Sequence, residues 1–528
     1  MSKTCKPWLR TAHFLVISIV IPSQAIGQFS TQTLGRNVNE PSLVLSPQKP
    51  AQAIIATNIN RIFHFDESTQ KYRGYETTSS LGVYGDPVLH YAGDTLFYAH
   101  LSKTPHKPYG DWFDRIVVQK IHRINPWEET SYSVGYNPPK MQDKPWLSSD
   151  NHSKNYKGNV YVTWTEFDQY GSKDTNHFSR IRFSSYHTSR DSFIPPITIS
   201  DTVGDCVDSD NTLEGATTAV GKKGELYATW SGHSKIWFDK SFDGGETWGK
   251  DQVIAQQLAG WDMELPHIMR ANGMPFLACD TVRDILYVTW ADEKEGNTNV
   301  WLIYSENKGD VWSKPILISK QIGNQYFPNI TVDPSSGNIY VAYYDQQYSS
   351  SNRFYDITLT QINVHDSARY YSYRISPQSI PLPGKDIFFG DYLDIDYNEN
   401  YLALAYTSYD QENTTVQLFI SPTNQLKSNT PNTRPFSHSF LNINDTTEWT
   451  LNVQKPLTIS YKIQTRKGLK YSKQRNQKTY HPENTNRDYI IAKIPPEGNT
   501  RIKYTISVQN NNGEKLIYKG RKILVISN

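Results

Sequence analysis

A five-residue apolar pattern, typical of a buried strand, recurs seven times along the chain. Successive copies start 43 to 66 residues apart, about the length of a four-stranded unit with loops of variable size. One such unit cannot cover both faces of its own sheet, so the units must stack around a central channel. The pattern therefore predicts an all-β fold, a seven-bladed β-propeller. The seven copies are Ala53–Thr57, Leu96–His100, Val160–Trp164, Leu226–Trp230, Leu286–Trp290, Ile339–Tyr343 and Leu402–Tyr406.

After the seventh copy the character of the chain changes. Residues 421–436 are rich in Pro, Ser, Thr and Asn, which is typical of a linker. Residues 437–528 contain five alternating runs and the turn Asn510–Gly513, which predict a small C-terminal β-sandwich. We therefore expect the propeller to occupy residues 37–420.

The N-terminus has the order of a secretory signal peptide. Lys3, Lys6 and Arg10 precede an apolar run, Phe14–Ile21, which is followed by the small-residue triplet Ser23–Ala25. The run is too short to span a bilayer, so we assign residues 1–25 to a signal peptide and expect no transmembrane span. The mature protein is then secreted, periplasmic or associated with the cell surface, which disfavours nucleic acid as a partner.

Charge is divided unevenly along the chain. Residues 422–528 hold 18 Lys and Arg against 6 Asp and Glu, although the whole chain has a net charge of only +2. The C-terminal region could therefore bind an acidic glycan or a cell-surface polyanion, which the acidic propeller would repel. The alternative is a basic sandwich kept soluble by its lysines.

Two turns carry a more specific signal. Ser241–Trp248 has the sequence Ser-Phe-Asp-Gly-Gly-Glu-Thr-Trp, and Ser305–Trp312 repeats it with Asn307 in place of the aspartate. In these turns Ser and Asp side chains can cap backbone N–H groups, and glycine supplies a positive φ. Both resemble the Asp-box, or BNR repeat, of sialidase-like propellers.

The resemblance covers about residues 37–420, and its implications are specific. It implies that the boxes lie at the blade periphery, so Asp243, Trp248 and Trp312 have no catalytic role. The sialidases of this family have six blades, so a six-bladed ring is the alternative to seven. They also have an Arg-Ile-Pro motif, whose nearest match here is Arg61–Phe63. Guanidinium groups for an anionic sugar could come from Arg270, Arg283 and Arg353.

A second recurrent feature is a short segment, such as Glu40-Pro or Asp86-Pro, that leads into the innermost strand of each repeat beside the channel mouth. Residues from all seven repeats should converge there, and carboxylates combined with aromatic planes suit a sugar site. We predict Asp86 and Asp391 as the catalytic carboxylate pair, with Glu214 as support. The predicted substrate-binding residues are Trp146, Tyr392, Tyr326 and Glu40. The alternative is that each carboxylate caps backbone N–H groups of the neighbouring blade.

Two further features have a functional and a structural interpretation. His100 stands where other copies have Trp or Tyr, so it could be a general acid/base or metal ligand near Asp86, or a buried structural residue. Asp205, Asp208 and Asp210 share one loop and form a weak candidate calcium site, with a solvated turn as the alternative. No other cofactor is expected.

Together these features predict a secreted carbohydrate-active propeller, in its most specific form a glycoside hydrolase acting on an acidic glycan. One alternative is a non-catalytic propeller that binds glycans or assembles the cell envelope. A polysaccharide lyase using His100 and a tyrosine is the second alternative.

Overall fold

The computed structural model describes residues 29–426, apart from 105–112, 295–296, 320–322, 349–352 and 367–369, together with the C-terminal strands given below. The proposed signal peptide and most of the proposed linker lie outside the described residues. No helix in the described part of the chain has the length and apolar character that crossing a bilayer requires. A single turn of 3-10 helix, η1 (Thr423–Gln425), follows the last blade.

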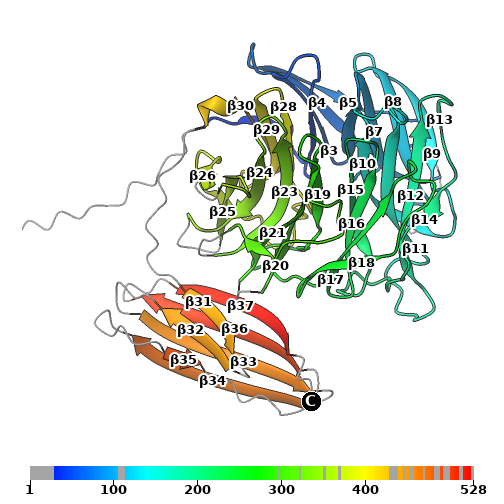
Figure 1. Ribbon diagram of the computed structural model, residues 1–528. Coiled ribbons are helices and arrows are strands. Elements are labelled where there is room, and N and C mark those ends of the chain that lie inside the picture. Colours follow the sequence, from blue (N-terminus) through cyan, green and yellow to red (C-terminus); the bar gives the residue numbers. More distant parts are fainter. Residues whose placement is uncertain are drawn as a thin grey trace, which may run out of the picture.

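Seven antiparallel sheets of four or five strands form a ring of blades (Figure 1). The predicted seven-bladed propeller is thereby confirmed. The first strands of neighbouring blades contact one another and line the channel. These inner strands are β2 (Ser42–Leu45), β6 (Val88–Ala92), β10 (Met141–Ser149), β15 (Glu214–Val220), β19 (Phe276–Asp280), β23 (Gln325–Asp333) and β28 (Asp394–Asn398).

All seven copies of the sequence pattern fall within the second strands of the blades, where both faces of the sheet are covered. Trp164, Trp230 and Trp290, at the ends of three copies, are fully buried. The second strands are β3 (Gln52–Thr57), β7 (Thr95–Ser102), β11 (Val160–Phe167), β16 (Leu226–Gly232), β20 (Ile285–Asp292), β24 (Asn338–Asp345) and β29 (Tyr401–Tyr409).

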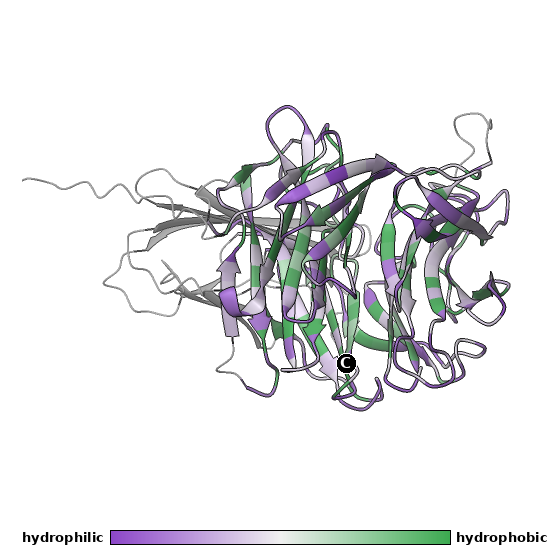
Figure 2. Cartoon of the chain, turned by 90° about the horizontal axis from the view of Figure 1, so that it is seen from above, coloured by the Kyte–Doolittle hydropathy of each residue, from purple (hydrophilic) through white to green (hydrophobic). Residues whose placement is uncertain are grey.

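The third and outer strands complete each blade, and polar residues (purple in Figure 2) are frequent in the loops that join the strands. The third strands are β4 (Arg61–Asp66), β8 (Arg115–Arg123), β12 (Ser179–His187), β17 (Lys235–Ser241), β21 (Asn299–Ser305), β25 (Phe354–Ile362) and β30 (Thr414–Pro422). The outer strands are β5 (Lys71–Glu76), β9 (Glu128–Val134), β13 (Ser192–Phe193), β14 (Ile197–Thr198), β18 (Gln252–Gln256), β22 (Ile316–Leu317), β26 (Tyr370–Arg374), β27 (Ile380–Pro381) and, in the seventh blade, β1 (Gln32–Leu34).

The seventh blade joins the two ends of the propeller. Its outer strand, β1, comes from the N-terminal end and pairs antiparallel with β30, Leu34 lying opposite Val416. Leu34 is fully buried in the cluster that also holds Leu43 and Phe63 of the first blade. The ring is thus closed by a strand that lies before the expected start at residue 37.

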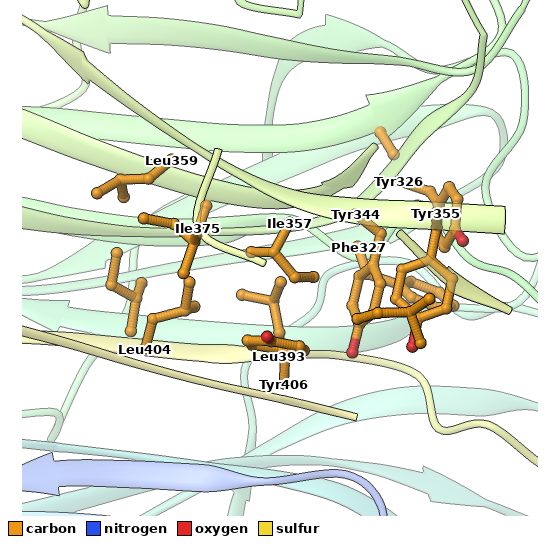
Figure 3. Packing of buried hydrophobic residues seen from close by; sticks show 14 of the residues in the cluster. Tyr326, Phe327, Tyr344, Tyr355, Ile357, Leu359, Ile375, Leu393, Leu404 and Tyr406 are labelled. Atoms are coloured by element: carbon orange, nitrogen blue, oxygen red, sulfur yellow. The ribbon is translucent and has the colours of Figure 1, made fainter. Parts of the chain in front are cut away.

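Apolar side chains fill the spaces between blades. In the cluster between the sixth and seventh blades, Tyr326, Phe327, Tyr344 and Tyr355 lie together at one end, as Figure 3 shows. The rings of Tyr326 and Tyr344 are stacked, with centroids 5.4 Å apart. Burial of these large rings supplies much of the hydrophobic free energy that holds neighbouring blades together.

The C-terminal region forms two antiparallel sheets. β31 (His438–Ile443), β32 (Thr446–Leu451) and β35 (Asp488–Ile490) make the first, and β34 (Lys470–Tyr480), β33 (Leu457–Lys467), β36 (Thr500–Asn510) and β37 (Lys515–Leu524) the second. The strands predicted there are present, whereas the packing of the two sheets as a sandwich stays a prediction.

Candidate functional site

Charged residues from the segments that enter several inner strands lie together at one end of the channel, where the sequence predicted residues from all seven repeats. We call this end the channel mouth and define it by eight charged residues from several blades. They are Glu40, Asp86, Asp143, Lys144, Asp208, Glu214, Arg270 and Asp391.

The backbone has an unusual conformation near the start of four inner strands, at three charged residues of the mouth and at Phe327, which has φ of 49° and also precedes a proline. Glu40, Asp86 and Lys144 have φ of 47°, 48° and 48°, and each precedes a proline. Side chains other than glycine rarely adopt this left-handed region, and residues held there often belong to functional sites. The shared turn directs the charged residues of three consecutive blades to the same end of the channel.

Asp391 is the electrostatic centre of the mouth. Its side chain is completely buried, and Lys144 Nζ lies 2.6 Å from Oδ2. Arg270 donates through Nε to Oδ1 at 2.9 Å and through Nη2 to Oδ2. The two cations hold the pKa of Asp391 at about 2, although burial alone would raise it. Asp391 is therefore a fixed carboxylate with both oxygens occupied.

A chain of hydrogen bonds connects Asp391 to the first two blades. The Asp391 amide donates to Glu40 Oε1 at 3.1 Å, and Asn58 Nδ2 donates to Glu40 Oε2. Asn58 Oδ1 accepts the Asp86 amide at 2.9 Å. Glu40 is therefore a positioning residue, because both oxygens of its buried carboxylate already accept hydrogen bonds within the protein.

Arg270 reaches the mouth on the long loop between β18 and β19. An isolated bridge between Met263 and Ala271 shapes this loop, and Asp210 Oδ1 accepts the Gly260 and Asp262 amides at 3.0 and 3.1 Å. About a third (35%) of the Arg270 side chain is exposed, so the mouth is open on this side. The sequence named Arg270 only as one of three arginines. Arg283 instead bonds Asp280 and the carbonyl of Pro334.

Three carboxylates of the mouth each have one buried oxygen without a hydrogen-bond partner among the described residues. They are Asp86 Oδ2, Asp208 Oδ1 and Glu214 Oε2. Asp86 Oδ2 lies 3.9 Å from Lys144 Nζ, beyond hydrogen-bond distance. Asp208 accepts a hydrogen bond from Tyr170 on its other oxygen. Buried acceptors of this kind are costly unless a ligand supplies donors.

Carboxyl groups at the mouth differ strongly in proton affinity. Burial, with Asp86 and Asp208 nearby, raises the pKa of Asp143 to about 7 despite the opposing effect of Lys144. Burial also raises the pKa of Glu214 well above its usual range, and Asp208 adds to this shift. The pKa of Glu40 is raised in the same way, first by burial and then by Asp86. Protonated and ionised carboxyls thus lie in one site near neutral pH.

Asp143 and Lys144 were not selected from the sequence, although they adjoin Trp146. Asp143 Oδ1 accepts the Lys144 amide at 2.9 Å, and Asp143 is only partly buried. The signal that could have identified them is the pair of residues before Pro145, which matches the Glu40-Pro and Asp86-Pro entries.

The predicted sugar platforms differ in accessibility. Trp146 is half-buried and packs edge-on against Phe276 and Tyr392, with centroids 5.2 and 6.1 Å apart. Tyr392 is buried beneath the mouth, whereas Tyr326 is 0% exposed within the aromatic cluster of Figure 3. A ring covered by protein on both faces cannot stack on a sugar, so only Trp146 keeps this role as a prediction.

His100 lies between the first two blades. Its ring packs near Tyr98, Nδ1 donates to the Leu101 carbonyl at 2.9 Å, and Nε2 faces Gln119 Nε2 at 3.0 Å. Burial lowers the pKa of His100 to about 4, so the ring is neutral near pH 7. This environment favours the structural interpretation over an acid/base role.

The three loop aspartates predicted to bind calcium have separate partners. Asp205 accepts hydrogen bonds from Ser209 and Thr212, Asp208 faces Tyr170 and Arg270, and Asp210 caps the β18–β19 loop. Among the described residues, no group of three or more His, Cys, Asp or Glu could hold a metal ion. Calcium binding stays a prediction. Cys206 and Cys279 are both free.

The two Ser-X-Asp/Asn turns have the same hydrogen bonding. Ser241 Oγ accepts the Gly245 amide at 3.0 Å, and Ser305 Oγ accepts the Gly309 amide at 2.9 Å. Each turn joins a third strand to an outer strand, and its Trp packs on a Phe of the preceding blade. Both turns therefore act in folding, away from the channel.

Below the mouth, the inner strands enclose a cavity of about 570 Å³. Its wall includes two aspartates of β28 that bond the first blade. Asp394 Oδ2 accepts the Leu43 amide at 2.7 Å, and Asp396 Oδ2 accepts the Leu45 amide at 2.8 Å. We call these two residues the ring aspartates. Among the carboxylates that the sequence predicted, Glu40 fulfils the same capping alternative, because it accepts the Asp391 amide of the neighbouring blade.

Comparison with known proteins shows likeness in fold alone. No family model and no curated protein matches this chain. Similar solved structures include the NanB sialidase of Streptococcus pneumoniae, with 10% identity, a TM-score of 0.41, and 74% of this chain and 84% of that chain covered. A PL25 ulvan lyase has the same identity and TM-score, and the match covers 74% of this chain and 96% of the lyase chain. A fungal alcohol oxidase in complex with copper has 11% identity, a TM-score of 0.44, and coverage of 94% and 99%.

Proposed function

We propose that the protein is a secreted carbohydrate-active propeller and that its channel mouth cleaves a glycosidic bond. The observation that carries this proposal is the pairing, in one partly open site, of a carboxyl that keeps its proton to about pH 7 with a carboxylate that is ionised. Asp143 is the former, and Asp391, with its pKa held at about 2, is the fixed charge beside it. Carboxyls with separated pKa values are what glycoside hydrolysis requires.

In this mechanism Asp143 donates a proton to the glycosidic oxygen as the bond to the leaving sugar breaks. Asp86, the other member of the predicted pair, then acts as base or nucleophile through Oδ2, which has no hydrogen-bond partner among the described residues. Asp391 takes a positioning role, because Arg270 and Lys144 occupy both of its oxygens. Glu214 remains the supporting residue.

The test is mass-spectrometric analysis of products after incubating the protein with neutral, amino and acidic oligosaccharides. Products whose summed mass exceeds that of the substrate by one water identify hydrolysis, whereas an unsaturated product with no water gained identifies a lyase. We expect Asp143→Asn to lower kcat by roughly 100-fold or more, the usual contribution of a general acid. Absence of any product across the panel would contradict catalysis and leave the binding propeller.

We also propose that the basic C-terminal region retains the protein on a polyanionic surface. Its excess of 12 positive charges supports this role. Removing residues 422–528 should weaken binding to an acidic polysaccharide and flatten its dependence on salt. Unchanged binding would assign retention to the propeller.

A further inference from the structure

The balance of charge at the mouth limits which ligands it can take. Six carboxylates face two cations there, and Asp391 already engages both cations. Even when Glu40, Asp143 and Glu214 are left out of the count, three acidic side chains, Asp86, Asp208 and Asp391, accompany Lys144 and Arg270. An anionic sugar would therefore have to displace Asp391 from its partners, against the repulsion of Asp86 and Asp208.

The unpartnered oxygens indicate what the mouth lacks. Glu214 is the first residue of β15 and only 2% exposed, yet its Oε2 has no hydrogen-bond partner among the described residues. Asp208 Oδ1 and Asp86 Oδ2 are in the same condition. Three acceptors from different segments of the mouth are thus each suited to an N–H or O–H donor.

A protonated amine satisfies this arrangement better than a hydroxyl group. It supplies up to three donors and a positive charge, so it can pair with more than one carboxylate. The aromatic ring of half-buried Trp146 adds a surface for the apolar face of a sugar. A neutral sugar would leave the excess negative charge uncompensated.

We propose that the substrate of the mouth is an amine-bearing saccharide, a glycan with free hexosamine residues, bound through Glu214, Asp208 and Asp86. This inference rests on the proposed function and refines its substrate class. The two charged regions then bind different ligands: the acidic mouth binds a cationic sugar, and the basic C-terminal region binds polyanions.

The test compares a glucosamine tetramer with its fully N-acetylated counterpart, in which each charged amine is replaced by a larger, uncharged acetamide. Calorimetric titration of the full chain at pH 6.5 should give at least tenfold tighter binding of the amine. Binding should also release protons, because a nearby cation lowers the pKa of Asp143. Two buffers of different ionisation enthalpy measure that release.

Variants locate the effect. Glu214→Gln should abolish the preference for the amine, and Asp86→Asn should reduce it, which serves if the first variant does not fold. The control, Asp310→Asn, removes one negative charge from an exposed turn at the periphery and should keep the preference. Equal or tighter binding of the acetylated tetramer would overturn the substrate class and leave glycan activity standing. Failure of both tetramers and of every panel glycan to bind would overturn the proposed function itself.

Discussion

The carboxylates of the channel mouth and the ring aspartates are both buried, but they have different partners. Asp394 and Asp396 accept backbone N–H groups from the first blade, and burial raises their pKa to about 7 and about 6. At the mouth, Asp391 pairs with side-chain cations, while Asp86 and Glu214 each retain an oxygen that has no partner in the part of the chain that the structure describes. A raised pKa therefore does not by itself identify a functional carboxyl. The partners distinguish a carboxylate that fastens blades from one that is available to a ligand.

The largest expected effect is on the buried ion pairs of the mouth. Asp391→Asn leaves Lys144 and Arg270 without their anion and should lower the free energy of unfolding by about 3–5 kcal/mol. Thermal and urea denaturation measure this loss. The exposed pair Lys240–Asp310 is the matched control, and Asp310→Asn should change stability by about 1 kcal/mol or less. Equal effects of the two variants would show that Asp391 is not the electrostatic centre.

Next comes the fastening of the first and seventh blades. Asp394→Ala removes the acceptor of the Leu43 amide and the Ser42 hydroxyl, so unfolding should become easier by roughly 2–3 kcal/mol. The affinity of the folded variant for a mouth ligand should stay as in the parent protein. A large loss of affinity with unchanged stability would contradict the division between mouth and ring.

Glu214→Gln should not lower the free energy of unfolding, in contrast to the two preceding variants. The substitution keeps the shape of the side chain but removes a buried carboxyl with an unpartnered oxygen, so we expect stability to stay level or rise by about 1 kcal/mol. Activity should fall at the same time. Denaturation and turnover assays on one preparation check both, and loss of stability would assign Glu214 to the structural group.

The last prediction concerns the slope of stability with pH. Asp143 and Asp394, both with a pKa of about 7, keep protons that the unfolded chain loses above about pH 4. The folded state binds more protons in this interval, so stability should fall as pH rises from 4 to 7. Differential scanning calorimetry should show this decline, with a shallower slope in Asp143→Asn. A midpoint that rises over the same interval would contradict the raised pKa values.

The sequence predicted the repeating parts of the molecule more fully than the singular ones. The second strands were recognisable because burial on both faces gives each blade the same apolar run. β1 has only three residues, Gln32–Leu34, and no pattern distinguishes so short an edge strand from a loop. Its role depends on pairing with β30, nearly four hundred residues away, which local periodicity cannot show.

In the candidate site too, the residues at repeated positions were easier to predict than the others. Glu40, Asp86 and Asp391 were found because they occupy corresponding entries to inner strands. Arg270 lies on an irregular loop whose path depends on tertiary contacts, so no spacing marks it. Tyr326 occupies a corresponding entry too, but its apolar neighbours Phe327 and Tyr344 draw it into the core. Position in the repeat gives proximity to the channel, whereas packing decides which side chains face it.

The pairing of β1 with β30 also sets the order of biogenesis. A ribosome that has released the first blade has not yet synthesised the strand that β1 joins, and this strand ends at Pro422. The N-terminal segment must therefore wait until six blades and most of the seventh have emerged. Contacts so distant in sequence slow folding. A nascent propeller that is truncated anywhere before the seventh blade lacks the pairing of β1 with β30, so its ring of sheets stays open.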